Sequence, residues 1–333
     1  MNASRRLWVQ QVLLCTLCAP LCAAATSVYE SAGPYRADLH DLRWTDVERS
    51  RTLPLRLRLP DAPGQRPVIL FSHGLGGSVD GGRFWGEHWA SHGFMVIHIQ
   101  HPGSDASVWR EASRPAMALE QAADLEQFIA RVRDVQYVLD ELARRQRAGD
   151  ALAARADLAR IGMSGHSFGA ITTQAIAGQD YEVPAGLAQR LGPTADPRPR
   201  AFVAFSPSAR GRQQLGQFAA IARPFFSVTG TRDGMVSMGL GVPAGQRLLP
   251  FEGMPPGGKY LLNLTGADHM VFNGGPRWRV ESSNPQLDAL HIRLVQETTT
   301  AFWHAYLLDD RNALAWLQAL DSAVGGQGRF LRK

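Results

Sequence analysis

The segment Gly165-His166-Ser167-Phe168-Gly169 decides the fold of this chain, because its two flanks favour different structures. The residues before it, Leu158-Ala159-Arg160-Ile161-Gly162-Met163, are typical of a short buried strand, and those after it, at 170–177, are typical of a helix. A serine in so tight a strand-to-helix turn has a strained backbone, and the glycines at 165 and 169 remove side chains that would collide there. The pattern therefore predicts that the hydroxyl of Ser167 projects above the carboxyl edge of a β-sheet.

A G-x-S-x-G sequence between a strand and a helix is the nucleophile elbow of the α/β-hydrolases. Glycine and serine are common residues, so the three fixed positions alone carry little weight. The strand and the helix on either side strengthen the interpretation. A glycine-rich turn without any chemistry is the alternative, and the presence of catalytic partners elsewhere in the chain decides between the two.

Strand-like and helix-like segments alternate along the chain on both sides of this motif. Strands are predicted twice within 35–59 and then at 67–71, 93–99, 158–163, 200–205, 224–228 and 259–264, and helices at 84–92, 118–148, 170–177 and 285–307. Such alternation is typical of a mainly parallel sheet covered by helices on both faces. The segment 178–199 is too short for a separate lid domain. We expect one α/β-hydrolase domain over residues 26–333, with no large lid.

A serine hydroxyl is a weak nucleophile, so it needs a base to take its proton and an acid to orient the base. In this fold the acid and then the histidine follow the serine along the chain. Asp233 directly follows the 224–228 strand, and His269 lies just past the 259–264 strand. We therefore expect Ser167, Asp233 and His269 to be catalytic. Asp268 is the alternative acid, but adjacent residues rarely present their side chains to each other in a triad.

Two backbone N–H groups are expected to bind the oxyanion that forms during acyl transfer. One is that of Phe168, directly after the serine, and the other is that of Leu75, in the glycine-rich loop at 72–77. His73 lies in the same loop but precedes the serine in the chain, so we interpret it as part of the loop scaffold. The segments 102–109 and 235–251 follow sheet edges and are expected to line the substrate cleft.

Residues 1–25 have the features of a cleaved secretory signal peptide. Arg5 and Arg6 give a basic start, an apolar run continues to Leu21, and small residues at 23–25 suit a cleavage site. All three cysteines lie within this segment, so the mature chain would have no thiol for a disulfide, a nucleophile or a thiolate metal site. We expect a periplasmic or secreted protein.

Several classes of partner are not expected. The net charge of +5 is not concentrated in any Lys/Arg tract, which argues against nucleic-acid binding. No segment after the first 25 residues approaches the ~18 apolar residues that span a membrane. The 72–77 loop lacks a phosphate-binding pattern. His98, His101 and Asp105 straddle a turn and do not share one face, which argues against a metal site. We expect a monomer that needs no cofactor or metal and acts on an ester.

Three segments together resemble known hydrolase families. Phe71-Ser72-His73-Gly74-Leu75-Gly76, Ala90-Ser91-His92-Gly93-Phe94 and the 165–169 motif resemble platelet-activating-factor acetylhydrolases and related bacterial predicted dienelactone hydrolases. The same layout looks like the polyester-hydrolase, cutinase-like branch of the α/β-hydrolases. The resemblance covers roughly residues 55–272. It implies a carboxylic ester hydrolase with a triad of Ser167, Asp233 and His269 and with Leu75 and Phe168 as oxyanion donors.

The sequence departs from these families at three points, which leaves the substrate open. The acid of the acetylhydrolases follows the preceding strand, where this chain has Phe205-Ser206-Pro207-Ser208, and true dienelactone hydrolases use a cysteine. The polyester hydrolases usually carry an aromatic residue in place of Leu75. The expected function is hydrolysis of short-acyl esters by a serine esterase through an acyl-enzyme. A lipase or polyester depolymerase with the same triad is one alternative. A non-catalytic binding protein on the same fold is the other.

Overall fold

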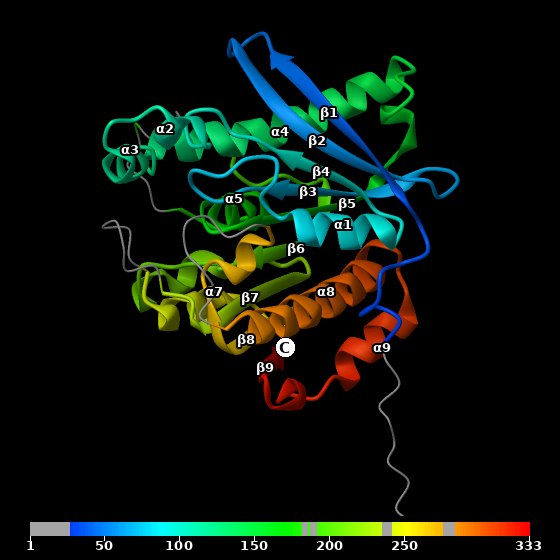
Figure 1. Cartoon of the computed structure of the whole chain (residues 1–333), viewed down its shortest axis with the longest axis vertical. Helices are drawn as coiled ribbons and strands as arrows, with labels where there is room; N and C mark the ends of the chain where they lie inside the picture. The colour runs from blue at the N-terminus through cyan, green and yellow to red at the C-terminus, as the bar shows by residue number, and fades with distance from the viewer. Residues whose placement is uncertain (1–26, 182–185, 187–191, 235–241, 276–283) are drawn as a thin grey trace, which may run out of the picture.

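The computed structural model describes residues 27–181, 186, 192–234, 242–275 and 284–333. The expected signal peptide at 1–25 lies outside the described residues, and so does the beginning of the expected cleft segment 235–251. The described part contains a nine-stranded sheet with helices packed on both of its faces (Figure 1). This is the mainly parallel, helix-covered sheet of the α/β-hydrolase fold, as the sequence predicts.

The strands follow one another along the chain as β1 (Ala37–Asp46), β2 (Arg51–Pro60), β3 (Arg66–Ser72), β4 (Met95–Ile99), β5 (Ala156–His166), β6 (Pro199–Phe205), β7 (Phe225–Arg232), β8 (Lys259–Asp268) and β9 (Gly328–Arg332). The helices are α1 (Arg83–Ser91), α2 (Ser107–Arg110), α3 (Pro115–Gln121), α4 (Leu125–Arg147), α5 (Phe168–Ala177), α7 (Leu249–Gly253), α8 (Pro285–Leu307) and α9 (Arg311–Ala319).

The strands lie in the order β1-β2-β4-β3-β5-β6-β7-β8-β9 across the sheet. Strands β4, β3, β5, β6, β7 and β8 run parallel to one another, so their carboxyl ends meet at one edge. The hairpin of β1 and β2 adds antiparallel strands at one side, and β9 adds an antiparallel strand at the other. Residues that directly follow the parallel strands are therefore gathered along a single edge of the sheet.

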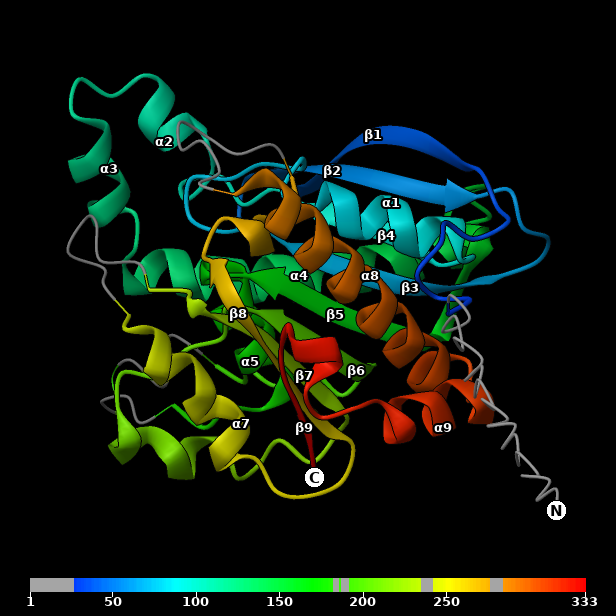
Figure 2. The same ribbon diagram turned by 60° about the horizontal axis from the view of Figure 1, so that its bottom comes forward.

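Side chains of the central strands alternate between two hydrophobic layers. Val68 and Leu70 of β3 pack in the layer under α4 and α5, whereas Ile69 and Phe71 pack in the layer under α1 and α8. Alternation of this kind follows from the two-residue period of a strand. A strand with both faces buried reads as a continuous apolar run, which explains the sequence of β3. Figure 2 shows α8 crossing the sheet beside α1, on the face opposite α4.

One predicted helix is wrong in its extent, and four elements were not predicted. The predicted helix at 118–148 is two helices, α3 and α4, because the side chain of Asp124 accepts the backbone N–H of Gln127 at 2.7 Å and starts α4 anew. The short helices α2 and α7, the helix α9 and the edge strand β9 were not predicted. Within the described residues, no helix is both long and apolar enough to cross a membrane.

Candidate active site

Ser167 occupies a strained turn between β5 and α5. Its φ of 55° lies in the left-handed region, which residues other than glycine rarely adopt. Its backbone N–H donates to the carbonyl oxygen of Phe205 at 2.9 Å, which ties the turn to β6. Strained backbone of this kind is concentrated at functional sites, where the surrounding structure maintains it. The geometry therefore matches the elbow that the sequence predicts.

The two glycines of the elbow are required by close backbone approach. A Cβ atom on Gly169 would lie 1.9 Å from the carbonyl oxygen of Ser72, and one on Gly165 would lie 2.3 Å from the carbonyl oxygen of Gly169. Neither distance is compatible with a side chain unless the backbone moves. The elbow consequently packs directly against the end of β3.

Asp233 and His269 form a buried hydrogen-bonded pair at the carboxyl edge of the sheet. Asp233 follows β7 directly and His269 follows β8. The Nδ1 atom of His269 donates to Oδ1 of Asp233 at 2.7 Å. The second carboxylate oxygen of Asp233 accepts the hydroxyl of Thr229, also at 2.7 Å. Both oxygens of this fully buried carboxylate are therefore occupied, and the imidazole is oriented by one of them.

His269 also contacts the elbow itself. The Nε2 atom of His166, the residue before the serine, lies 3.1 Å from the carbonyl oxygen of His269, and the two imidazole rings have their centroids 4.6 Å apart. Burial holds the pKa of His166 well below its usual value, so its ring is neutral and Nε2 donates to that carbonyl. The structure thus brings all three residues of the predicted triad to one edge of the sheet.

The alternative residues for the acid and the base have other partners. The carboxylate of Asp268 accepts the backbone N–H groups of Met270 at 3.0 Å and Val271 at 3.1 Å and so starts the short 3₁₀ turn after β8. His73 is buried, with Nδ1 2.6 Å from the carbonyl oxygen of Gly74 and Nε2 accepting the backbone N–H of His101 at 3.0 Å. Asp233, not Asp268, is the described hydrogen-bond partner of His269.

The loop after β3 closes over the elbow. A Cβ atom on Gly74 would lie 3.5 Å from the Cβ of Ser167, so the backbone of this loop runs beside the serine. Leu75 comes next in the loop, and Phe168 begins α5. Neither the N–H of Leu75 nor that of Phe168 donates a hydrogen bond within the described part of the chain. Two backbone donors near Ser167 are therefore available for a ligand oxygen.

Arg247 is a buried residue of this site that sequence reasoning missed. Its guanidinium donates to the backbone oxygen of Ser206 at 2.8 Å and to that of Asp233 at 3.2 Å, and Nη2 lies 3.5 Å from Nδ1 of His269. Burial lowers the pKa of Arg247, and the charge of Asp233 opposes that effect. No fixed spacing relates such an arginine to the elbow, so the sequence carried no signal for it.

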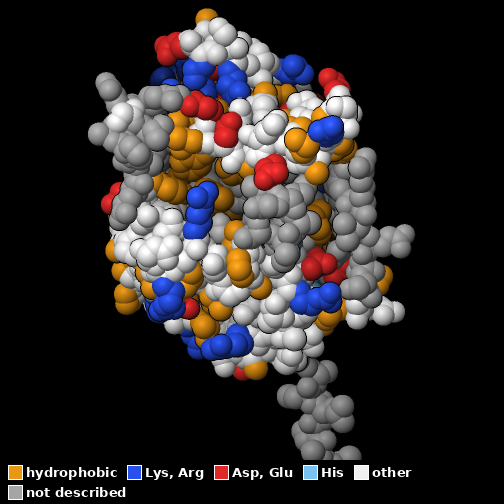
Figure 3. Space-filling view, turned by 90° about the vertical axis from the view of Figure 1, so that its left-hand side faces the viewer, with side chains coloured by type: hydrophobic (Ala, Val, Ile, Leu, Met, Phe, Trp, Pro, Cys, Tyr) orange, Lys and Arg blue, Asp and Glu red, His pale blue; other side chains and the backbone are white. Residues whose placement is uncertain are grey.

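The predicted cleft segment 102–109 lies against the oxyanion loop. The indole N–H of Trp109 donates to the carbonyl oxygen of Gly76 at 2.8 Å, and the N–H of Gly76 donates to the carbonyl oxygen of Ser104 at 2.9 Å. Figure 3 views the side of the molecule that carries α2 and α3, and hydrophobic side chains gather around a hollow in this face. An apolar surface therefore borders the carboxyl edge.

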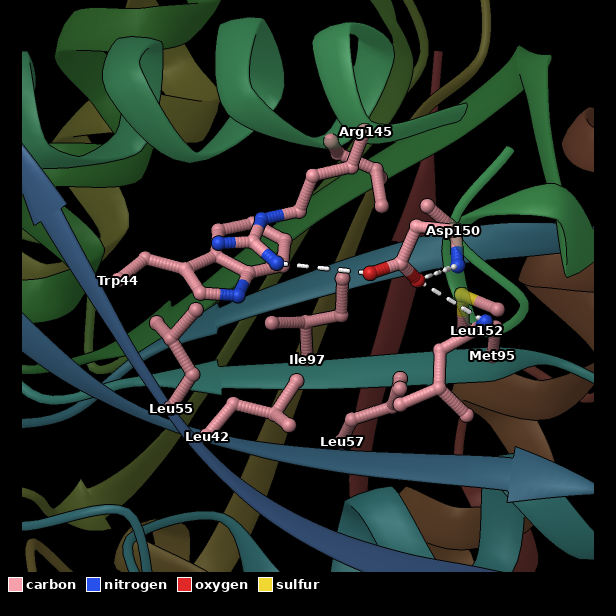
Figure 4. A pocket seen from close by; sticks show the side chains of 11 residues that line it. Leu42, Trp44, Leu55, Leu57, Met95, Ile97, Arg145, Asp150 and Leu152 are labelled. Carbon is pink, nitrogen blue, oxygen red and sulfur yellow. Dashed lines mark hydrogen bonds and ion pairs between the residues drawn. The ribbon is translucent and has the colours of Figure 1, made fainter. Parts of the chain in front are cut away.

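A separate cavity lies away from this edge. It measures about 40 Å³ and is enclosed by the β1–β2 hairpin, β4 and the second half of α4 (Figure 4). Leucines and Trp44 line most of it, while Arg145 and Asp150 contact each other beside it. None of the predicted site residues lines it, so this cavity is a packing void and not the reaction site.

Residues considered for a metal site all have protein partners. His101 contacts Ser72 and Asp134, the Nδ1 of His98 lies 2.8 Å from a backbone carbonyl, and Asp105 accepts from Gln100 and Ser107. Within the residues that the structure describes, no cluster of three or more His, Cys, Asp or Glu side chains could hold a metal ion.

The parallel sheet, the elbow and the comparison with known families together define the class of protein as an α/β-hydrolase. Residues 24–187 match the model of the Chlorophyllase family, an α/β-hydrolase-like family. The match covers the strands β1 to β5, the elbow and α5. It supports the hydrolase superfamily and does not single out the acetylhydrolase or cutinase-like branch that the motifs resemble. No curated protein sequence matches the chain significantly.

Proposed function

We propose that this protein is a serine hydrolase of carboxylic esters, with Ser167 as nucleophile, His269 as base and Asp233 as orienting acid. The observation that carries the proposal is the 2.7 Å contact between Nδ1 of His269 and Oδ1 of Asp233, at the same sheet edge as a serine with a φ of 55°. An acid, a histidine and a strained serine after three parallel strands are what acyl transfer in this fold requires. The Chlorophyllase family match further supports an ester hydrolase.

Catalysis would proceed in two halves. The Oγ of Ser167 attacks the ester carbonyl carbon while Nε2 of His269 takes the hydroxyl proton, and the imidazolium then gives that proton to the departing alcohol. Water, deprotonated by the same histidine, attacks the acyl-enzyme; the imidazolium then returns that proton to Oγ of Ser167 as the acyl–Oγ bond breaks, and the carboxylic acid is released. Asp233 stays ionised throughout and holds the imidazole with Nδ1 protonated.

The two free backbone N–H groups of Leu75 and Phe168 would bind the oxyanion of each tetrahedral intermediate. Removal of one such donor costs about 10²- to 10³-fold in kcat in serine hydrolases. Phe168 is also the first residue of α5, so the positive end of the helix dipole adds to the stabilisation.

The substrate is proposed to be a short-acyl ester, with a lipid or polyester as the alternative. The matched family is named Chlorophyllase, so chlorophyll is included among the esters to be tested. The apolar surface near α2 and α3 is compatible with a bulky apolar group on either side of the ester bond. A panel should therefore vary the acyl and alcohol parts independently.

A kinetic panel tests the proposal. Nitrophenyl esters from acetate to laurate, a polyester film and chlorophyll are incubated with the wild type, with Ser167→Ala and with Ser322→Ala, whose serine is exposed and remote from the elbow. We expect the wild type and Ser322→Ala to hydrolyse at least one ester equally and Ser167→Ala to lose at least about 10³-fold. Full activity in Ser167→Ala would refute the proposal, and a folded wild type that hydrolyses none of the esters would favour a binding protein.

A further inference from the structure

Helix α4 buries an arginine beneath the oxyanion loop. Arg131 has no exposed surface, although burying a guanidinium is costly unless its donors are satisfied. Its described hydrogen bonds go mainly to backbone carbonyls and serine hydroxyls, whereas most buried arginines are expected to pair with a carboxylate. The segments that carry these oxygen atoms therefore indicate what the buried arginine does.

The first set of contacts reaches the loop before Leu75. The Nη1 atom of Arg131 donates to the carbonyl oxygen of His73 at 2.7 Å, and Nη2 lies 3.5 Å from the carbonyl oxygen of Gly74. The carbonyl of Gly74 belongs to the same peptide unit as the N–H of Leu75, and the carbonyl of His73 belongs to the unit before it. The guanidinium therefore fixes the backbone that carries the first proposed oxyanion donor.

The second set of contacts supports the same loop from its other side. The Nε atom donates to the hydroxyl of Ser104 at 2.8 Å, and Nη2 donates to its carbonyl oxygen at 3.3 Å. That carbonyl oxygen also accepts the N–H of Gly76 at 2.9 Å. Arg131 and Ser104 thus hold the residues on both sides of Leu75.

The third contact is with the residue after the nucleophile. The guanidinium carbon of Arg131 lies 4.3 Å from the centroid of the ring of Phe168. A cation over an aromatic face is attracted by the ring quadrupole, and more strongly when both groups are desolvated. One buried side chain consequently contacts the loop that presents Leu75 and the residue that presents the second proposed donor.

A neighbouring Ser-His-Asp arrangement is structural. The Oγ of Ser72 lies 2.9 Å from Nε2 of His101, and Nδ1 of His101 lies 3.0 Å from Oδ2 of Asp134. The spacing is that of a triad, but none of the three side chains has exposed surface, and Asp134 also binds Arg49 and Arg51. No substrate could reach this serine, so the arrangement fixes the end of β3 from which the oxyanion loop starts.

We propose that Arg131 is a positioning residue for the oxyanion hole and holds the N–H groups of Leu75 and Phe168 in one geometry. The inference rests on the proposed function, because it concerns the rate of ester hydrolysis. Burial lowers the pKa of Arg131 to about 9, with the charges of Asp134 and Asp105 opposing that effect, so the group is still charged at neutral pH. Its charge also favours an anion at the nearby donors.

The test compares Arg131→Lys and Arg131→Met with Arg144→Met, a control that makes the same change at an exposed position of α4. Each is measured on the best nitrophenyl ester for kcat and KM, on an alkylboronic acid that forms a tetrahedral adduct with the serine, and on the carboxylate product as inhibitor. We expect Arg131→Met to lower kcat about 10²-fold, with KM within about threefold. Affinity for the boronic acid should fall by a similar factor, while product inhibition stays unchanged.

Arg131→Lys keeps the charge but loses the planar fork of donors, so kcat and boronic acid affinity should fall about tenfold. Arg144→Met should behave as the wild type. The inference is overturned if a folded Arg131→Met retains wild-type kcat and boronic acid affinity, or, where that variant does not fold, if Arg131→Lys retains both. Failure of the proposed function would give a different result: either Ser167→Ala would still hydrolyse the esters, or the wild type would hydrolyse none of them.

Discussion

The Nδ1 atom of His269 lies 2.7 Å from Oδ1 of Asp233, and the two residues reach each other across 36 positions of sequence because β7 and β8 end side by side. The hydroxyl of Thr229 holds the other oxygen of the same carboxylate. The aspartate is therefore held before any substrate arrives, and the imidazole takes its orientation from it. The assignment of Asp233 as the orienting acid can therefore be tested by comparing its substitution with that of the neighbouring Asp268.

Asp233→Asn should lower kcat/KM by about 10⁴-fold, because an amide can hold the imidazole in the wrong tautomer while the geometry stays intact. The matched control is Asp268→Asn, which alters the start of the 3₁₀ turn after β8 and should cost less than about tenfold. Both are measured as kcat/KM on the best ester of the panel. A large loss in Asp268→Asn together with a small one in Asp233→Asn would reverse the assignment.

Gly169→Ala should destabilise the protein by about 3 kcal/mol, because the new Cβ would lie 1.9 Å from the carbonyl oxygen of Ser72 and the elbow must shift. Gly216→Ala is the control, since a Cβ there would meet nothing within 4 Å and should change the free energy of unfolding by less than about 1 kcal/mol. Urea unfolding measures both. Equal stabilities of the two variants would contradict the close packing of the elbow on β3.

Buried histidines should make the protein less stable in mild acid. Burial lowers the pKa of His88, His101 and His304 to about 4, whereas histidine in an unfolded chain titrates near pH ~6.5. Between these values the unfolded chain binds protons that the native protein does not, so stability is complete above pH ~6.5 and falls as the pH drops toward ~4. Each histidine contributes up to about 3 kcal/mol to that fall.

Urea unfolding at several pH values between 7 and 4.5 checks this dependence. His304→Phe removes one of these three titratable groups. The pKa of His304 is lowered by burial and by His92, and the charge of Asp310 opposes that effect. The variant should show a shallower loss of stability with falling pH than the wild type. Identical slopes for the two proteins would contradict a depressed pKa at this position.

Asp134→Asn should lower the free energy of unfolding by about 3 kcal/mol, because it removes the charge of a fully buried carboxylate that compensates the partly buried Arg49 and Arg51. Asp140→Asn lies on the same helix and pairs with Arg198 at the surface, so it should cost less than about 1 kcal/mol. Thermal and urea unfolding give both values. An unchanged free energy of unfolding in Asp134→Asn would show that the ion pairs of Asp134 do not stabilise the packing of α4 on the sheet.

The residues that could be predicted from sequence share a local signal. The elbow has fixed spacing, and both Asp233 and His269 directly follow apolar runs that form strands. The fold required only the alternation of such runs with amphipathic segments. The helix at 285–307 was predicted from its apolar residues, and it matches α8, whose start is capped by the side chain of Asn284.

The residues that were missed act through contacts distant in sequence. Arg247 and Arg131 each look like a surface charge in the sequence, and only the packing of their helical segments against the sheet edge buries them. A single helix was predicted at 118–148 because the apolar residues keep helical spacing in this segment, and nothing in that spacing shows that Asp124 caps the start of a new helix. The strand β9 is short and pairs only at the edge of the sheet, so its sequence lacked the apolar run of the central strands.

Covalent labelling with a fluorophosphonate tests the central claim most directly, since it reports an activated serine without any assumption about the ester. The wild type, Ser167→Ala and His269→Ala are treated with the probe and digested, and the adduct is located by mass spectrometry. We predict one adduct, on the peptide that contains Ser167, at full occupancy in the wild type and absent or much slower in both variants. A folded wild type that stays unlabelled at Ser167, or labelling that persists in His269→Ala at the wild-type rate, would contradict the account.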